Sequence, residues 1–307
     1  MDLGIVMNIF KLLLVTTILT IVSFADSFKH PFLWKVEKGG KTTAYLFGTM
    51  HIPSPELSIL PPLVLSKLND SDAVYTEIEL SLVNQMKLST LMLRKDGKTL
   101  KEILSKKLYR RTENYLKTIS PLLTLEPFAK MKMWALSATI GLLEEQLKHM
   151  GLVPIDDVIF TYGKEHNKTV GGVESVEEQL GYFDNFTMKE QILMLESTLD
   201  YLETHSSYTD DMKKLYLEGD GSKMVAFTNE QFKDKKYLKL EEKFMKILLY
   251  QRNVIMAKRI DKLLKRYPKQ KHFFAFGVMH FLDKKSVVTN LEKMGYRVRR
   301  VDSLSKN

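Results

Sequence analysis

The hydrophobic pattern predicts strands near both ends of the chain and helices between them. Two β-rich runs within residues 32–51 flank Gly39 and Gly40, a dipeptide that tolerates the positive φ angles of a tight hairpin turn. Further short apolar runs predict strands over residues 72–80, 168–175, 272–280 and 296–302.

Helical periodicity fills most of the chain between these strands. Apolar residues recur at spacings of three and four over residues 99–119, 123–150 and 155–167. Two capping-box pairs, Ser175 with Glu178 and Thr187 with Glu190, predict further helix starts. This order of elements favours an α/β fold with a mixed, partly parallel central sheet, flanking helices and a large helical insertion.

Residues suited to metal binding or acid–base chemistry stand where these predicted strands end. In open α/β sheets, ligands bind outside the carboxyl ends of the strands. Five residues lie at or near such ends, namely His51, Glu77, Glu79, Glu174 and His280. The two histidines close a repeated Phe-Gly-x-Met-His, which is a weak signal when taken alone. The placement of all five favours a shared site over the alternative that each histidine is merely hydrogen-bonded to a loop.

The chemistry of this set suits a divalent metal. The two-residue period of a strand places Glu77 and Glu79 on one face, where two buried carboxylates need a cation. Imidazole and carboxylate ligands together suit Zn, Mn, Co or Fe(II), so the expected metal ligands are His51, His280, Glu77 and Glu79. A bound metal can lower the pKa of water toward about 7, and Glu77 or Glu174 would then serve as the catalytic base.

Two other residue types bear on this site. Gly48 and Gly277 each stand three residues before a histidine, and the missing Cβ would let a neighbouring backbone or a ligand come close. Arg252 lies in a predicted helix with an apolar face and allows two interpretations. It either extends to a surface acid or acts as a catalytic residue that holds a substrate carboxylate or an oxyanion.

Composition narrows the possible function classes. The 307 residues are 44% hydrophobic and 27% charged, as in globular proteins, and the absence of cysteine excludes disulfides, thiol nucleophiles and thiolate zinc sites. The net charge is +9, but lysines alternate with glutamates on amphipathic helices, so we expect no nucleic-acid partner. Motifs for serine nucleophiles, nucleotide hydrolysis and dinucleotide binding are absent.

The N-terminus has the pattern of a secretory signal peptide. Lys11 precedes an apolar run over residues 12–22, and Ser23 and Ala25 fit a cleavage site after Ala25. We therefore expect a signal peptide at residues 1–25, starting at Met1 or Met7, and a single domain at residues 26–307. The alternative is an uncleaved N-terminal membrane anchor. The protein is accordingly expected to be exported, to a periplasm or outside the cell.

Several segments, taken in order, carry a family resemblance. They are "LWKVEKGGKTTAYLFGTMHIP", "DAVYTEIEL", "IDDVIFTYGKEHNKTVGGVESVEEQL", "QRN" and "FFAFGVMHFLDKKSVVTNLEKMGYRVRRV". Together they resemble the TraB/GumN family, which is related to the TIKI metalloproteases and more distantly to the erythromycin-esterase/ChaN-like group. Val173 and Phe281 replace leucines of the family pattern. The sequence shows no membrane anchor after these segments, so we expect an exported relative rather than a tethered enzyme.

The resemblance implies pseudo-duplicated halves, each with one Gly-x-x-His, and divalent-metal-dependent peptide hydrolysis. The candidate site that it carries over comprises His51, Glu77, Glu79, Glu174, Arg252 and His280. We expect an exported metal-dependent hydrolase, a peptidase in particular, that uses Mn, Co or Zn and acts on a peptide or small polar substrate. The alternative is a non-catalytic protein of the cell envelope that sequesters a peptide or haem. The sequence carries no signal for an oligomeric state.

Overall fold

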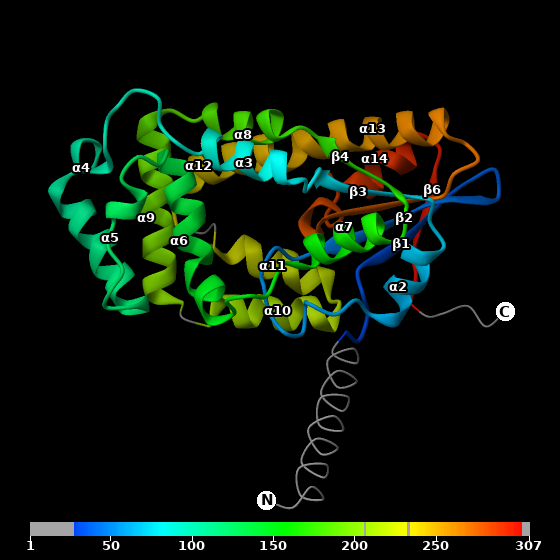
Figure 1. The fold of residues 1–307 in the computed structure, drawn as a ribbon, viewed down its shortest axis with the longest axis horizontal. Helices are drawn as coiled ribbons and strands as arrows, with labels where there is room; N and C mark the ends of the chain where they lie inside the picture. The colour runs from blue at the N-terminus through cyan, green and yellow to red at the C-terminus, as the bar shows by residue number, and fades with distance from the viewer. Residues whose placement is uncertain (1–27, 206, 232–233, 303–307) are drawn as a thin grey trace, which may run out of the picture.

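A mixed sheet of six strands forms the centre of the protein (Figure 1). The computed structural model describes residues 28–205, 207–231 and 234–302, so the signal peptide expected at residues 1–25 lies outside the described residues. The strand order across the sheet is β4-β3-β5-β2-β1-β6. The strands are β1 (Leu33–Lys38), β2 (Lys41–Thr49), β3 (Ala73–Ile78), β4 (Thr169–Glu174), β5 (His272–Gly277) and β6 (Arg297–Arg300).

The partly parallel sheet expected from the sequence is confirmed. Strands β4, β3, β5 and β2 run parallel, whereas β1 is antiparallel to both of its neighbours. The β1–β2 hairpin turns at Gly39 and Gly40, whose φ angles are 58° and 78°, as the dipeptide predicts. Because parallel strands end at the same edge, β2 and β5 finish side by side, with Thr49 opposite Gly277.

Helices cover both faces of this sheet (Figure 1). Helices α2 (Pro62–Asn69) and α7 (Ile155–Glu165) lie against one face, and α13 (Arg252–Arg266) with α14 (Val287–Lys293) cover the other. Strands covered on both sides read as continuous apolar runs, and β5 is one of them. The core between the layers is rich in phenylalanine, with Phe47, Phe273, Phe274 and Phe276 fully buried.

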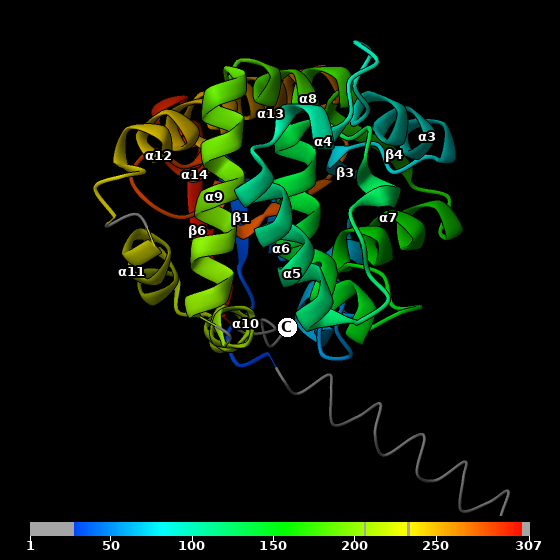
Figure 2. The same ribbon diagram turned by 90° about the vertical axis from the view of Figure 1, so that its left-hand side faces the viewer.

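The remaining helices form a region beside the sheet, on the left in Figure 1 and toward the viewer in Figure 2. The hairpin turn is at the opposite end, so the parallel strands end toward these helices (Figure 1).

The large helical insertion consists of two stretches, one after β3 and one after β4, which meet mainly through α6 and α9. The first contains α3 (Leu82–Leu91), α4 (Leu100–Ile103), α5 (Lys106–Ile119), η1 (Glu126–Phe128) and α6 (Met133–Lys148). The second contains α8 (Val176–Asp184), α9 (Met188–Thr204), α10 (Tyr208–Glu218), α11 (Gly221–Gln231), α12 (Leu238–Phe244) and the π-helix η2 (Met245–Gln251).

Capping residues set the helix boundaries. The predicted capping boxes are confirmed, since Ser175 opens α8 and Thr187 opens α9, each with its glutamate three residues later. The single helical stretch predicted over residues 99–119 is divided into α4 and α5. The division occurs because Leu104 is extended and the Ser105 hydroxyl accepts a hydrogen bond from the Leu108 N–H, which starts a new helix.

None of the helices in the described residues combines the length and the apolar character that a membrane crossing requires. The longest of them, α9, has 17 residues and carries several acidic side chains. A membrane-spanning helix needs about 20 predominantly apolar residues.

Replacing Gly172 with alanine is expected to destabilise the protein. A Cβ at Gly172 would lie 2.4 Å from the Glu79 nitrogen and 2.7 Å from the Ile78 carbonyl carbon, which are backbone atoms and cannot rotate away. We expect the free energy of unfolding, measured by urea denaturation, to fall by about 1–3 kcal/mol. Gly171→Ala is the matched control, because its Cβ would meet only the Tyr75 ring, at 3.3 Å. Equal losses in the two variants would contradict this explanation.

Candidate functional site

Three neighbouring strands bring two histidines and a glutamate together. His51 follows β2, His280 ends the short helix η3 (Val278–His280) after β5, and Glu77 is near the end of β3. The Glu77 Oε1 atom lies 3.6 Å from His51 Nε2 and 3.6 Å from His280 Nε2. The sheet order places β5 between β3 and β2, which explains why residues so distant in sequence converge.

The His51 ring is oriented by Asp156, which lies in helix α7. Its Nδ1 lies 2.8 Å from Asp156 Oδ2, and the other oxygen of Asp156 accepts a 2.6 Å hydrogen bond from the Thr49 hydroxyl. A carboxylate can only accept here, so Nδ1 carries the proton and Nε2 faces Glu77. The Asp156 charge raises the pKa of His51 well above its usual value. The side chain of His51 is 52% exposed, so solvent screens part of this effect.

His280 is buried and held by an amide. Its Nδ1 lies 2.6 Å from Asn253 Oδ1, and the Asn253 Nδ2 donates to the Lys285 carbonyl at 2.9 Å. The second bond fixes which end of the amide faces the ring, so His280 Nδ1 is the donor and Nε2 keeps its lone pair. Burial lowers the pKa of His280 to about 4, which makes the ring neutral at pH 7.

Glu77 is a buried carboxylate with several donors. Its Oε1 accepts from the Gly277 N–H at 2.9 Å, and its Oε2 accepts from Gln179 at 2.7 Å and from Arg252 at 2.6 Å. Burial disfavours the charged form, but the charge of Arg252 and the neighbouring His51 outweigh it and hold the pKa of Glu77 well below its usual value. Glu77 is therefore ionised at neutral pH.

Arg252 joins Glu77 to Glu174. Its Nη2 lies 2.6 Å from an oxygen of each glutamate, and its Nη1 donates to the Leu248 carbonyl. The π-helix η2, a form often found at functional sites, ends immediately before Arg252 and supplies that carbonyl. Arg252 is 7% exposed and its partners are buried, so the interpretation as a surface-directed arginine is wrong. Burial raises the pKa of Glu174, while Arg252 favours its charged form.

The two motif glycines have different physical roles. A Cβ at Gly48 would meet Val278 at 2.9 Å and Phe32 at 3.1 Å, so Gly48 permits close packing of β2 against η3 and the residue before β1. A Cβ at Gly277 would lie 3.1 Å from His51 Nε2, 3.3 Å from Glu77 Oε1 and 3.7 Å from His280 Cδ2. Gly277 therefore leaves open a space that is bordered by all three side chains.

The charges of the cluster formed by His51, Glu77, Asp156, Glu174, Arg252 and His280 are unbalanced. Asp156, Glu77 and Glu174 supply three carboxylates, whereas Arg252 supplies one guanidinium. Without a metal, the raised pKa of His51 makes that ring a cation and leaves one negative charge uncompensated. If a metal displaced the His51 proton, both imidazoles would be neutral and two negative charges would remain for the ion to balance. Such an excess is costly to bury, and one divalent cation would neutralise it.

The donor chemistry fits a divalent metal, although the arrangement is not a closed ligand set. Among the described residues, no group of three or more His, Cys, Asp or Glu side chains qualifies by its geometry as a metal-binding group. Two ligands held about 2.1 Å from one ion at a tetrahedral angle lie about 3.4 Å apart. The 3.6 Å separations between Glu77 Oε1 and each histidine Nε2 are close to that value. Both rings also have the Nδ1 partner that orients metal-binding histidines.

Two candidate residues lie apart from the two histidines. Glu79 follows the end of β3 and is exposed, so it does not share the buried face of Glu77 as the strand period predicts. The strand ends at Ile78, which is why the alternation fails there. Glu174 has a fully buried side chain and reaches the cluster only through Arg252.

The orienting residues Asp156, Gln179 and Asn253 were not among the sequence-based site candidates. Asp156 and Gln179 lie in quoted motif segments, and Asn253 follows Arg252 directly, so their positions carried a signal. Their roles depend on contacts across the fold, since Asp156 is 105 residues from His51 and Gln179 is 102 residues from Glu77.

A family model covers all of these residues. The model of the TraB/PrgY/gumN family matches residues 32–300, a range that contains every residue of the cluster. The chain belongs to this family. No solved structure matches it.

Curated relatives of this family member are named metalloproteases. They include a metalloprotease TIKI homolog of Nematostella vectensis, 25% identical over 89% of this chain and 67% of the relative. Metalloprotease TIKI2 of Danio rerio is 26% identical over 88% of this chain and 60% of the relative. Metalloprotease TIKI1 of Homo sapiens is 24% identical over 88% and 61%. The chain thus spans about three fifths to two thirds of the length of these relatives.

Replacing Arg252 with methionine should destabilise this TraB/PrgY/gumN family member in a pH-dependent way. The variant would leave Glu77 and Glu174 buried without a cation, which costs about 3–5 kcal/mol at pH 7. In the wild type the lowered pKa keeps Glu77 ionised, whereas in the variant burial without a cation would raise the pKa of both glutamates, so they would take up protons as pH falls and the penalty would be relieved. The difference between variant and wild type should therefore shrink toward pH 4.

Urea denaturation at several pH values measures this difference. The matched control is Arg259→Met on the same helix, because Arg259 pairs with the exposed Glu178 and its loss should cost about 1 kcal/mol or less. A constant deficit from pH 7 to pH 4 would show that lost packing, and not the unpaired charge, explains the effect.

Proposed function

We propose that this protein is an exported metal-dependent hydrolase, and a peptidase in particular. The observation that carries the proposal is the convergence of His51 Nε2 and His280 Nε2 on Glu77 Oε1, with each ring oriented through Nδ1. The names of the relatives support peptide hydrolysis as the reaction class. The N-terminal pattern of a signal peptide supports export.

In this proposal His51, His280 and Glu77 hold a divalent cation, with Mn, Co or Zn as candidates. Such an ion lowers the pKa of bound water and polarises a substrate carbonyl when it is present. Asp156 and Asn253 keep the two Nε2 lone pairs directed at the site. Gly277 keeps the space between the ligands free of a side chain. Gln179 and the Gly277 N–H hold the Glu77 carboxylate in one orientation.

We assign Arg252 a positioning role in place of direct contact with the substrate. Its Nη1 and Nη2 groups and its Nε all have partners in Leu248, Glu77 and Glu174. Glu174 is engaged in the same network and is fully buried, so we place it beside Arg252 as a counter-charge. His51 is half exposed, so its side of the site is the one that solvent and substrate can approach.

Metal content and peptidase activity should depend on the two histidines. We expect about one divalent ion per purified chain by elemental analysis, together with cleavage of a peptide library that a chelator abolishes. The double variant His51→Ala, His280→Ala should lose both, whereas His166→Ala, at an exposed position, should retain both. Retention of metal and activity by the double variant would refute the proposal. Tight ligand binding without turnover of any peptide would favour the alternative of a sequestering protein.

The two glutamates of β3 offer a sharper comparison. Glu77→Gln should lower metal affinity by at least about tenfold, because the buried carboxylate is a proposed ligand. Glu79→Gln removes the same charge two residues away at an exposed position and should leave the metal content unchanged. Loss of metal in Glu79→Gln, with metal retained in Glu77→Gln, would exchange the roles assigned here.

Gly277→Ala tests whether the space between the ligands is used. The added methyl group would lie 3.1 Å from His51 Nε2 and 3.3 Å from Glu77 Oε1, so it should exclude an ion from this space. We expect loss of metal measured by elemental analysis, with a melting temperature close to that of the metal-free wild type. An unchanged metal content in Gly277→Ala would place the ion elsewhere.

A further inference from the structure

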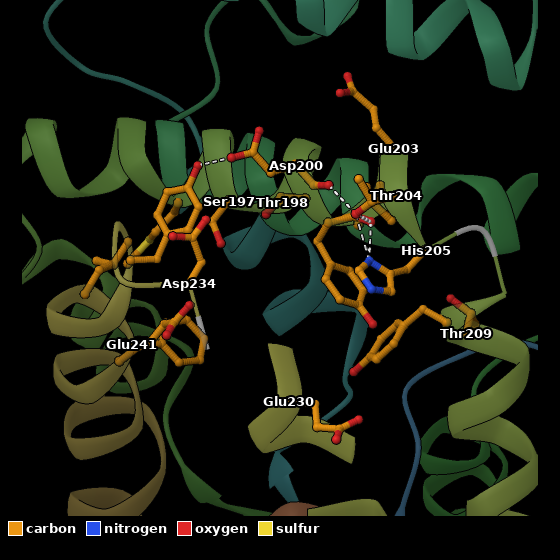
Figure 3. Close-up of a pocket in the computed structure, with 18 of the residues that line it drawn as sticks. Ser197, Thr198, Asp200, Glu203, Thr204, His205, Thr209, Glu230, Asp234 and Glu241 are labelled. Atoms are coloured by element: carbon orange, nitrogen blue, oxygen red, sulfur yellow. Dashed lines mark hydrogen bonds between the residues drawn. The ribbon is translucent and has the colours of Figure 1, made fainter. Parts of the chain in front are cut away.

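A large cavity lies beside the candidate site, among the helices that face the strand ends. It measures about 760 Å³ and is lined by residues of α9, α10, α11 and α12 (Figure 3). Ile52, which directly follows His51, is part of its wall. One wall residue of the cavity is therefore the sequence neighbour of a proposed metal ligand, at the edge of the sheet where the parallel strands end.

The cavity wall is acidic in a protein whose net charge is +9. Five carboxylate side chains line it, namely Asp200, Glu203, Glu230, Asp234 and Glu241. Arg111 is the only lysine or arginine among the described residues that line the cavity. Its guanidinium is engaged by Asp200 at 2.7 Å and by Glu203 at 2.6 Å. Asp234 and Glu241 have no arginine or lysine counterpart among the described residues that line this wall.

Glu241 is the acid that most needs a partner. It is 7% exposed, and its buried Oε2 has no hydrogen-bond partner among the described residues. Burial, together with the nearby Asp234, raises the pKa of Glu241 to about 7. Figure 3 shows Glu241 extending from α12 on the side of the cavity that also holds Asp234. A buried carboxyl without a partner is destabilising, and a cation placed beside it would relieve that cost.

Aromatic side chains complete the wall. Phe227 and Phe244 line the cavity together with Tyr201 and Tyr208, and Phe227 stacks on Tyr208 with ring centroids 5.2 Å apart. Aromatic rings pack well against the methylene stem of a long side chain and attract a cationic head group. The combination of apolar rings and an uncompensated carboxylate suits a long, positively charged side chain.

We propose that this cavity binds the ammonium or guanidinium group of a lysine or arginine side chain in a peptide substrate. The inference rests on the proposed peptidase function, because the peptide would pass from the cavity over Ile52 to the site at His51. Glu241 and Asp234 would face the cationic head, and the aromatic rings would contact its stem. The cavity would thereby select substrates by charge and length of one side chain.

The test uses the purified full chain and two fluorescein-labelled alanine hexapeptides that differ at one central position, lysine or norleucine. Fluorescence anisotropy measures their dissociation constants with and without EDTA. We expect the lysine peptide to bind about tenfold more tightly, as for one charged hydrogen bond in a partly buried site. Free cadaverine serves as a second probe and should compete with the lysine peptide only weakly, because it lacks the peptide backbone.

Two neighbouring glutamates provide the matched variants. Glu241→Gln should abolish the preference for lysine, whereas Glu242→Gln, which removes the same charge at an exposed position outside the cavity, should preserve it. Asp234→Asn, in the exposed segment before α12, should weaken the preference and provides a second variant if Glu241→Gln does not fold. Equal affinity of the two peptides for the wild type, or an unchanged preference in both cavity variants, would overturn the inference.

The outcomes also separate this inference from the proposed function. Preference for lysine that depends on Glu241, without cleavage of any peptide, would support the cavity assignment and refute the peptidase. Cleavage of peptides without any preference for charge would support the peptidase and refute the cavity assignment. Competition by cadaverine as strong as that by the lysine peptide would show that the cavity takes free amines, and would overturn the assignment to a peptide side chain.

Discussion

The rest of the site depends on the ion pairs that the buried Arg252 guanidinium forms with Glu77 and Glu174. The guanidinium connects α13 to the ends of β3 and β4 through Glu77 and Glu174, all of them shielded from solvent. A buried ion pair often contributes little net stability, because desolvation offsets the attraction, but removing one partner is costly. We therefore interpret this network as a device that specifies position. It holds Glu77 ionised and aimed at the two histidines, which simple apolar packing would not do.

Charge balance then explains why the site has distinct parts. The site has three carboxylates and one guanidinium, so it attracts a cation even though His280 is neutral. His51 differs from its counterpart because it is half exposed and paired with Asp156, whereas His280 is buried and bonded to an amide. The repeat of Gly-x-x-His thus produces two histidines with different environments. The cavity that Ile52 helps to line, in the helical region, is also acidic, since Asp234 and Glu241 are part of its wall.

Much of the fold followed from local patterns. The hairpin at Gly39 and Gly40 and both predicted capping boxes are present, because each depends on residues close together in sequence. The parallel strands were predicted from the alternation of strands and helices along the chain. The helical insertion was expected as one element, but it is assembled from two stretches. Their association through α6 and α9 depends on packing between apolar faces that no single stretch reveals. The break at Ser105 shows the limit of periodicity, since one capping serine divides an otherwise continuous helical pattern.

The sequence by itself placed His51, Glu77 and His280 at one edge of the sheet, because parallel strands that end at the same edge bring their last residues together. It therefore identified His51, Glu77 and His280 as neighbours. Only the tertiary structure decided what each one contacts. Asp156 and Asn253 orient the rings across more than 25 residues of separation, and the end of β3 at Ile78 leaves Glu79 in solvent. Such contacts depend on how layers pack and where strands stop, and residue spacing encodes neither.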